Sequence, residues 1–203
     1  MSDMFLYGAS GHARVVADAL ESQGVRISGV VDDNPQLDKF GSLPVLHSAE
    51  GCSPFIVTIG DCRIRKKVVE RLGDVAFGKA IHKASVISPS ARIGDGSVVM
   101  AGAVIQPGAV VGEHSIINTG ASVDHDCRIS GFVHIAPHCT LCGDVSVGEG
   151  TWIGAGSTVI QGIHIGRNCF IGAGSVVVGD IPDDSFCYGN PCRVIRKNEI
   201  DHE

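Results

Sequence analysis

The sequence has no Lys/Arg-rich block and no long apolar run. Its 203 residues include 16 Lys and Arg and 22 Asp and Glu, which give a formal net charge of −6. Nucleic acids and anionic membranes attract clustered positive charge, so neither is an expected partner, although backbone N–H groups could hold a small anion. No stretch is long and apolar enough to span a membrane, and residues 1–16 lack the basic and apolar regions of an export signal. We therefore expect a cytoplasmic protein.

The eight cysteines lack the spacing of a disulfide framework. Without an export signal, reduced and mostly buried thiols are the expected state. Cys139 and Cys142 form a C-x-x-C, but no second pair lies at zinc spacing and nothing around them resembles a thioredoxin motif. We therefore expect no bound metal.

A six-residue repeat begins at Ile81 and continues without insertion. The first residue of each hexapeptide is aliphatic: Ile81, Ile87, Ile93, Val99, Ile105, Val111, Ile117, Val123, Ile129, Ile135, Leu141, Val147, Ile153, Val159, Ile165, Ile171 and Val177. The fifth residue is small or β-branched in nearly every unit. This period predicts a β-helix, in which short strands joined by tight corners wind around a narrow core. The repeat resembles that of the hexapeptide acyltransferases, which implies a left-handed parallel β-helix with three hexapeptides per coil over residues 81–182.

One outward-facing column of this β-helix is unusually apolar. With three hexapeptides per coil, residues 18 apart stack on each other, and the sixth hexapeptide position points outward by alternation with the inward first position. One such column reads Val98, Ile116, His134, Trp152 and Phe170. A water-facing tryptophan and phenylalanine disfavour an isolated monomer. We expect this face to be buried against a neighbouring subunit.

The N-terminal part of the chain lacks the hexapeptide period and predicts a small parallel α/β unit. The turn "YGASGHA" places Gly8 and Gly11 where a strand passes into a helix, and Asp32 and Asp33 end the next strand. Strands are expected over residues 3–8, 25–33 and 53–61, and helices over residues 11–24 and 61–72. The order looks like half of a Rossmann fold.

The glycine turn and the two acids suit a nucleotide. Glycines let the backbone approach a phosphate at a helix N-terminus, and an acid at the second strand end accepts hydrogen bonds from a ribose or base. The turn is not a full G-x-G-x-x-G. A single unit of this kind suits a nucleoside diphosphate sugar better than a dinucleotide.

The stretch "VDHDCRISGFVHIAP" keeps the hexapeptide pattern and adds two acids and two histidines. His125 occupies the third hexapeptide position, outside the inward first and fifth positions. A flanking carboxylate, Asp124 or Asp126, could raise the pKa of the imidazole or fix its tautomer, as a general base requires. Both acids point away from His125 in an extended strand, so direct pairing needs a corner between them. His134, in the apolar column, either donates to a thioester carbonyl or packs in an interface.

Together with "VVDD", "TIGDCRIRKKV", "AIHKASVISPSARI" and "GNPCRVIRK", these motifs resemble the bacterial sugar acetyltransferases that acetylate UDP-4-amino-sugars, the PglD-like enzymes, and their relatives that O-acetylate sialic acid. The resemblance implies a Rossmann-like UDP-sugar-binding domain over residues 1–80, acetyl-CoA as co-substrate, and a homotrimer with active sites between subunits. It implies that His125 is the base and that Asp126 increases its basicity. The implied acetyl-CoA contacts are His134, Ala155 and Ala173, and the implied substrate contacts are Ser10, Gly11, His12, Asp32, Asp33, Gly60 and Asn118.

The implied reaction is N-acetylation of the 4-amino group of a UDP-linked amino-dideoxy sugar. The amine loses a proton to His125 and attacks the thioester directly, while His134 or a backbone N–H stabilises the oxyanion. O-acetylation of a sialic acid or another surface-polysaccharide sugar and non-catalytic sugar-nucleotide binding are the alternatives. A zinc-dependent carbonic anhydrase on the same fold is disfavoured, because His134 and His138 are the nearest approach to its histidine set.

Residues 183–203 follow the last hexapeptide and are expected to form a C-terminal tail. Its basic residues suit a CoA phosphate, although basic tails are more often solvated; they are Arg193, Arg196 and Lys197.

Overall fold

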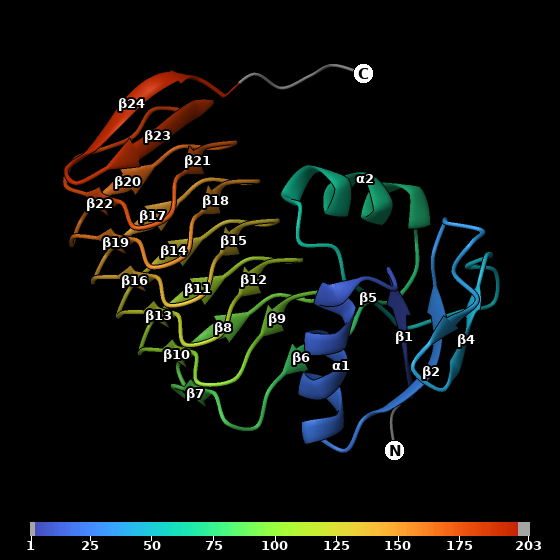
Figure 1. The fold of residues 1–203 in the computed structure, drawn as a ribbon. Helices are drawn as coiled ribbons and strands as arrows, with labels where there is room; N and C mark the ends of the chain where they lie inside the picture. The colour runs from blue at the N-terminus through green and yellow to red at the C-terminus, as the bar shows by residue number, and fades with distance from the viewer. Residues whose placement is uncertain (1–2, 199–203) are drawn as a thin grey trace.

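The computed structural model describes residues 3–198, which form an α/β unit packed against a left-handed parallel β-helix (Figure 1). The sheet of the first unit has the order β3-β4-β2-β1-β5, with β1 parallel to both β2 and β5. Its elements are β1 (Asp3–Tyr7), α1 (Gly11–Ser22), β2 (Arg26–Val31), β3 (Lys39–Phe40), β4 (Leu43–Leu46), β5 (Phe55–Val57) and α2 (Cys62–Leu72). The strands and helices expected from the sequence are all present.

The antiparallel β3–β4 hairpin has no counterpart in the sequence-based prediction. In β4 only Val45 is buried, and Pro44 interrupts the run of apolar residues. A strand that buries one side chain shows no period that distinguishes it from a loop.

The β-helix has three faces of short parallel strands. The first face contains β6 (Ala80–Ile81), β9 (Val98–Val99), β12 (Ile116–Ile117), β15 (His134–Ile135), β18 (Trp152–Ile153) and β21 (Phe170–Ile171). The second contains β7 (Val86–Ile87), β10 (Val104–Ile105), β13 (Ser122–Val123), β16 (Thr140–Leu141), β19 (Thr158–Val159) and β22 (Val176–Val177). The third contains β8 (Arg92–Ile93), β11 (Val110–Val111), β14 (Arg128–Ile129), β17 (Ser146–Val147) and β20 (His164–Ile165).

The strand pairing confirms three hexapeptides per coil. Ile105 pairs with Ile87 on one side and Val123 on the other, each 18 residues away. The first hexapeptide residues are buried from Val99 to Val177 and form one continuous core. Each coil passes from the first face to the second and then the third, so we name its bends the 1–2, 2–3 and 3–1 corners.

The corners from residue 96 to residue 174 depend on the fourth hexapeptide residue, which adopts a positive φ. Glycine fills this position in many units, for example Gly102, Gly108 and Gly156, because it adopts that conformation without strain. Asp126 takes the same conformation with φ 59°. The chain therefore bends beside His125, which is the corner that direct pairing with an aspartate requires.

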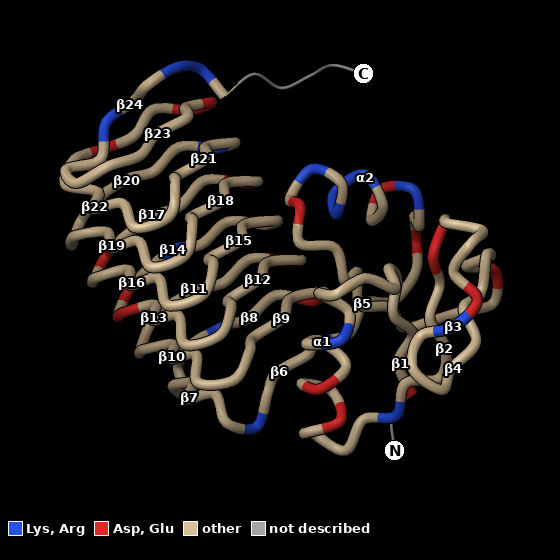
Figure 2. Tube along the Cα trace, viewed as in Figure 1, with Lys and Arg blue, Asp and Glu red and all other residues tan. Residues whose placement is uncertain are grey.

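A C-terminal hairpin closes one end of the β-helix. β23 (Ser185–Gly189) and β24 (Cys192–Lys197) extend the first face, and the guanidinium of Arg196 lies 4.3 Å from the ring centroid of Phe186. Residues 199–203 of the expected tail lie outside the described residues. Basic residues are prominent on α2 and β24 (Figure 2). Between residues 3 and 198, no helix has the length and apolar character needed to cross a bilayer.

The apolar column on the first face is covered mainly by the chain's own N-terminal unit. Val98 packs in one core with Val16 and Leu20 of α1, and Ile116 is equally buried. The prediction that a neighbouring subunit covers this face is therefore wrong for its first part, because α1 already removes it from water. Trp152 and Phe170, farther along the column, are only half-buried.

Candidate active site

The predicted substrate residues of the N-terminal unit lie at one edge of its sheet. Tyr7 aligns with Val31 and with Val57 at the carboxyl ends of β1, β2 and β5. Ligands of parallel α/β sheets bind outside the carboxyl ends of the strands. The residues that follow these three strand ends are Ser10, Gly11, His12, Asp32, Asp33 and Gly60.

Asp32 shapes this edge by accepting hydrogen bonds from the backbone. Its Oδ2 accepts from Ala9 N at 2.7 Å, and its Oδ1 accepts from Asn34 N at 2.9 Å. Gly8 has φ 110°, a conformation that residues with a Cβ rarely adopt. Asp32 therefore holds the glycine turn, and only its remaining lone pairs are available to a ligand.

Asp33 belongs to a hydrogen-bonded cluster with Tyr7 and Arg71. Its Oδ1 accepts from the Tyr7 hydroxyl at 2.5 Å, and its Oδ2 accepts from Arg71 Nη2 at 2.6 Å. The hydrogen bond from Tyr7, with help from Arg71, lowers the pKa of Asp33, while burial raises the pKa of Tyr7 to about 12. Asp33 is therefore a carboxylate near neutral pH, and Tyr7 stays protonated.

His12 lies in the first turn of α1, with its ring centroid 6.2 Å from that of His134. Its Nε2 is buried without a hydrogen-bond partner among the described residues. Burial, and to a smaller extent the charge of Arg65, lowers the pKa of His12 to about 4. His12 is therefore neutral at physiological pH, with an unpaired ring nitrogen beside the predicted substrate residues.

His134 joins the N-terminal unit to the β-helix. Its Nδ1 lies 3.0 Å from the carbonyl oxygen of Gly60, and its Nε2 lies 3.0 Å from Nδ2 of Asn118. Because a carbonyl only accepts, Nδ1 carries the proton and Nε2 accepts from the amide. The side chain is almost fully buried, which lowers its pKa to about 3. Of the two roles expected for His134, this geometry favours packing, and its acetyl-CoA contact stays a prediction.

Arg65 is a structural residue of the site that the sequence analysis missed. Its side chain is 1% exposed, and Nη1 donates to the carbonyls of Ile59 and Gly60 at 2.8 and 2.9 Å. Nε and Nη2 donate to the carbonyls of His114 and Phe132 on the β-helix at 2.8 and 2.9 Å. The available signal was an arginine inside the buried stripe of α2, which contains Cys62, Arg65 and Val68.

His125 and Asp126 form a pair at a 2–3 corner. The Nδ1 of His125 lies 2.9 Å from Oδ2 of Asp126, and both side chains are mostly exposed. Asp124 instead accepts from the backbone N of His125 at 2.7 Å, so Asp126 is the partner of the ring. The hydrogen bond to Asp126, together with the charges of Asp124 and Asp144, raises the pKa of His125.

Ala155 and Ala173 lie at a different corner of the β-helix. They occupy equivalent positions of adjacent coils at the 1–2 corner, and both are exposed. The N–H of Gly174, next to Ala173, donates to the carbonyl of Ala155 at 2.8 Å. A single chain therefore stacks the two predicted acetyl-CoA contacts but does not bring them to His125.

Comparisons with known proteins match both units. A model described as the PglD N-terminal domain matches residues 3–72, and one described as the bacterial transferase hexapeptide (six repeats) matches residues 90–125 and 144–179. PerB from Caulobacter crescentus, solved with CoA and GDP-perosamine, is 38% identical with a TM-score of 0.91, covering 97% of this chain and 98% of that chain. The chain belongs to the PglD-like sugar N-acetyltransferases.

Two further relatives of this PglD-like chain differ in how much of it they match. The acetyltransferase domain of PglB from Neisseria gonorrhoeae, in complex with acetyl coenzyme A, is 36% identical with a TM-score of 0.88, covering 95% of this chain and 98% of that chain. Uncharacterized protein L142 of Acanthamoeba polyphaga mimivirus is 35% identical over 96 residues, or 45% of this chain. The matched part is 20% of the length of that curated relative.

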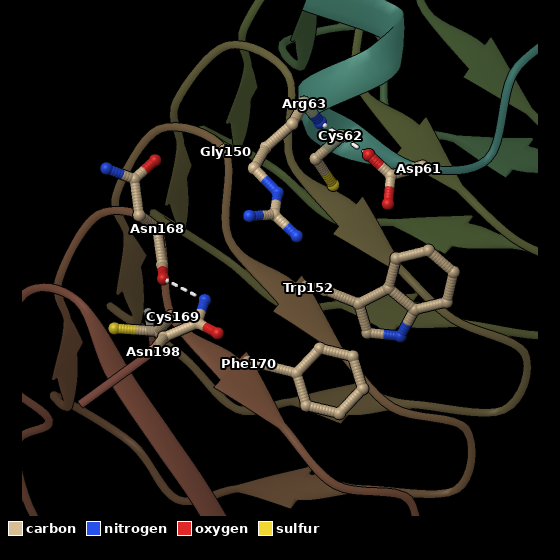
Figure 3. Close-up of a pocket in the computed structure, with 9 residues that line it drawn as sticks. All are labelled: Asp61, Cys62, Arg63, Gly150, Trp152, Asn168, Cys169, Phe170 and Asn198. Atoms are coloured by element: carbon tan, nitrogen blue, oxygen red, sulfur yellow. Dashed lines mark hydrogen bonds between the residues drawn. The ribbon is translucent and has the colours of Figure 1, made fainter. Parts of the chain in front are cut away.

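A cleft of about 300 Å³ lies where α2 meets the first face of the PglD-like β-helix (Figure 3). Figure 3 shows Arg63 extending from the start of α2 into the cleft, between Asn168 and Trp152, with Phe170 farther from the helix. Gly150 and Asn168 line the cleft from the 3–1 corner. Because Ala155 and Ala173 lie at the 1–2 corner, the cleft is separate from these two predicted acetyl-CoA contacts, whereas the third, His134, packs against Trp152 of the cleft with 4.1 Å between ring centroids.

All eight cysteines of the PglD-like chain are free thiols, and seven are buried, as the sequence analysis expected. Cys139 lies in the β-helix core, where burial raises its pKa, while Cys142 is half-buried. Within residues 3–198, no group of three or more His, Cys, Asp or Glu side chains is arranged to hold a metal ion.

Proposed function

We propose that this chain transfers the acetyl group of acetyl-CoA to the 4-amino group of a UDP-linked amino-dideoxy sugar, with His125 as the general base. The observation that carries the proposal is the His125–Asp126 pair. The Nδ1–H donates to the carboxylate at 2.9 Å, which leaves the Nε2 lone pair to accept a proton. A relative of this chain, PerB, was solved with CoA and a nucleotide-linked sugar, GDP-perosamine, which supports both substrate classes.

The transfer is direct. The sugar amine attacks the thioester carbonyl carbon and gives its proton to Nε2 of His125, so a C–N bond forms and a tetrahedral oxyanion results; the C–S bond breaks when this intermediate collapses. The proton then returns to the sulfur of the departing CoA. The cysteines are not needed as nucleophiles, and burial raises the thiol pKa of Cys127 to about 11. The free thiols also fit the cytoplasmic location expected from the sequence.

The oxyanion of the tetrahedral intermediate is assigned to a backbone N–H. Of the two donors expected, His134 uses its ring proton on the Gly60 carbonyl, 3.0 Å away. Donating to a thioester would leave that partly buried carbonyl with one partner fewer. His134 instead holds Asn118 in place through the contact of 3.0 Å at Nε2. Asn118 thereby lies beside the edge of the N-terminal sheet where the predicted substrate residues lie, which we call the substrate edge.

We place each active site between two subunits of a homotrimer. His125 lies at the 2–3 corner, whereas Ala155 and Ala173 lie at the 1–2 corner of the same chain. Three-fold packing joins different surfaces of neighbouring subunits, so it can set the 1–2 corner of one against the 2–3 corner of the next. The N-terminal substrate edge packs on the first face and would deliver its sugar to the same junction.

The experiment that tests this function measures thiol release from acetyl-CoA. The acceptor panel contains UDP- and GDP-linked 4-amino sugars and free sialic acid. We expect release with the UDP-linked amine and a fall in kcat of at least about a hundredfold in His125→Ala, because general bases contribute this much.

Other outcomes of the acceptor panel and of His125→Ala would change the assigned function. Release only with the GDP-linked amine would correct the nucleotide, and release only with sialic acid would assign O-acetylation. Sugar-nucleotide binding without any thiol release would indicate a binding protein. Near-wild-type turnover by His125→Ala would remove His125 as the base.

A further inference from the structure

His125 leans across a position that has no side chain. Gly143 occupies the same place as His125 on the next coil, 18 residues along the chain. A Cβ added to Gly143 would lie 2.4 Å from Nε2 and 2.5 Å from Cε1 of His125. Real Cβ atoms do not approach other atoms so closely, so the imidazole occupies the space that a side chain at position 143 would fill.

The Asp126 carboxylate lies over a second glycine, Gly108, on the coil before its own. Asp126 follows Gly108 by 18 residues, and a Cβ on Gly108 would lie 2.5 Å from Oδ1 of Asp126. The imidazole therefore lies over the coil after its own, while the carboxylate lies over the coil before. The distance of 2.9 Å between Nδ1 and Oδ2 depends on both spaces being open.

We propose that Gly143 is a positioning residue for His125, because its missing side chain leaves room for the imidazole to donate from Nδ1 to Asp126 while Nε2 lies over Gly143 and stays unpaired. The proposal rests on the proposed role of His125 as the base. Gly143 itself has no side chain that could contact the reacting atoms. It acts by letting the ring adopt the orientation in which Nδ1 donates to the carboxylate.

Gly143 offers a cleaner test than Gly108. Gly108 has φ 75°, so any side chain there strains the backbone, whereas Gly143 is outside the left-handed region. The atoms that a Cβ at position 143 would meet belong to an exposed ring that can turn away. We therefore expect Gly143→Ala to move the ring while the coil keeps its fold.

Gly179 provides a matched control. It occupies the third hexapeptide position at the same 2–3 corner, two coils beyond Gly143, and has no positive φ. A Cβ at Gly179 would meet nothing within 4 Å. Gly179→Ala therefore introduces the same methyl group in the same structural setting without contacting His125.

The test combines NMR titration of the His125 ring with steady-state kinetics. The His125 signal is assigned by its loss in His125→Ala. The charged groups facing this ring are Asp124, Asp126 and Asp144, and the bond to Asp126 contributes most to raising its pKa. In Gly143→Ala we expect the pKa of His125 to fall and kcat to decrease at least about tenfold, with KM within about twofold of wild type. Gly179→Ala should match wild type in both.

The outcomes separate this inference from the proposed function. A wild-type pKa and kcat in Gly143→Ala would overturn the positioning role. A lowered pKa in a protein that transfers no acetyl group would support the positioning role and reject the acetyltransferase assignment. If Gly143→Ala does not fold, the double variant His125→Ala/Gly143→Ala should fold, because the ring is gone; failure of the double variant would overturn the inference.

Discussion

At the scale of single residues, the pairing of His125 with Asp126 determines how the rate depends on pH. The hydrogen bond to Asp126 is the largest cause of the raised pKa of His125, and the charges of Asp124 and Asp144 add to it. His125 accepts a proton only when it is neutral. The transfer rate should therefore increase as the pH rises through this pKa and become constant above it.

Asp126→Asn tests this dependence. Asparagine tolerates the positive φ of 59° at this position and keeps an oxygen that can accept from Nδ1, but it removes the negative charge. The pKa of His125 should fall, so the rising limb of kcat/KM moves to lower pH and the plateau falls about tenfold because the base is weaker. Asp124→Asn is the control, since Asp124 contacts the backbone N of His125 and not the ring. Superimposable profiles for wild type and Asp126→Asn would contradict the pairing.

The sequence predicted that His125 is exposed, but it did not predict which flanking acid binds its ring. The hexapeptide pattern placed His125 outside the inward positions, and the structure finds it exposed. Which acid binds the ring depends on backbone dihedrals. Asp126 turns toward the imidazole because its φ is 59° and Gly108 leaves space below it. Neither property has a period that can be read from the residues alone.

At the scale of elements, Arg65 of α2 joins the substrate edge to the β-helix by hydrogen bonds. The guanidinium binds the Gly60 carbonyl at 2.9 Å on one side and the His114 and Phe132 carbonyls at 2.8 and 2.9 Å on the other. The last two residues lie on adjacent coils at the 3–1 corner. A single side chain thus fixes the relative position of two elements that the reaction needs.

Removing this side chain should destabilise the fold. Arg65→Ala would leave several buried carbonyls without their donor, and we expect the free energy of unfolding to fall by at least about 3 kcal/mol. Arg63→Ala is the matched control on the same helix, because Arg63 is exposed and its loss should cost less than about 0.5 kcal/mol. Urea denaturation monitored by circular dichroism measures both. Equal losses for the two variants would show that the contacts of Arg65 contribute little.

The elements themselves were largely predictable. Every two-residue strand from β6 to β22 ends at a first hexapeptide position, because an aliphatic residue there must face the narrow core. The β3–β4 hairpin was missed because β4 buries only Val45. Elements that bury a regular row of side chains leave a signal in the sequence, and elements that bury one do not.

At the scale of the whole molecule, the separation of the two corners predicts complementation between inactive subunits. His125→Ala removes the base, and Ala173→Trp blocks the predicted acetyl-CoA corner. If each site uses both corners from different subunits, co-assembled trimers of the two variants should regain about a quarter of the wild-type sites. Thiol release by the mixture, measured after unfolding and refolding the variants together, tests this expectation.

The result has two controls. Each variant refolded alone should remain inactive, and sedimentation should show a trimer in every sample. Mixtures that assemble as trimers without regaining activity would place both corners in one chain's site or remove Ala173 from it. A stable monomer that is fully active would contradict the shared site.

The sequence by itself determined the β-helix, the small α/β unit before it and the family to which the chain belongs. Periodic burial and short motifs are local properties, so they can be read from the order of residues. Tertiary structure alone decided that α1 covers the first part of the apolar column. It also decided that both ring nitrogens of His134 are hydrogen-bonded, to Gly60 and Asn118, and that Arg65 binds carbonyls from both units. These contacts join residues far apart in the chain, and only the packing of one unit on the other brings their atoms within bonding distance.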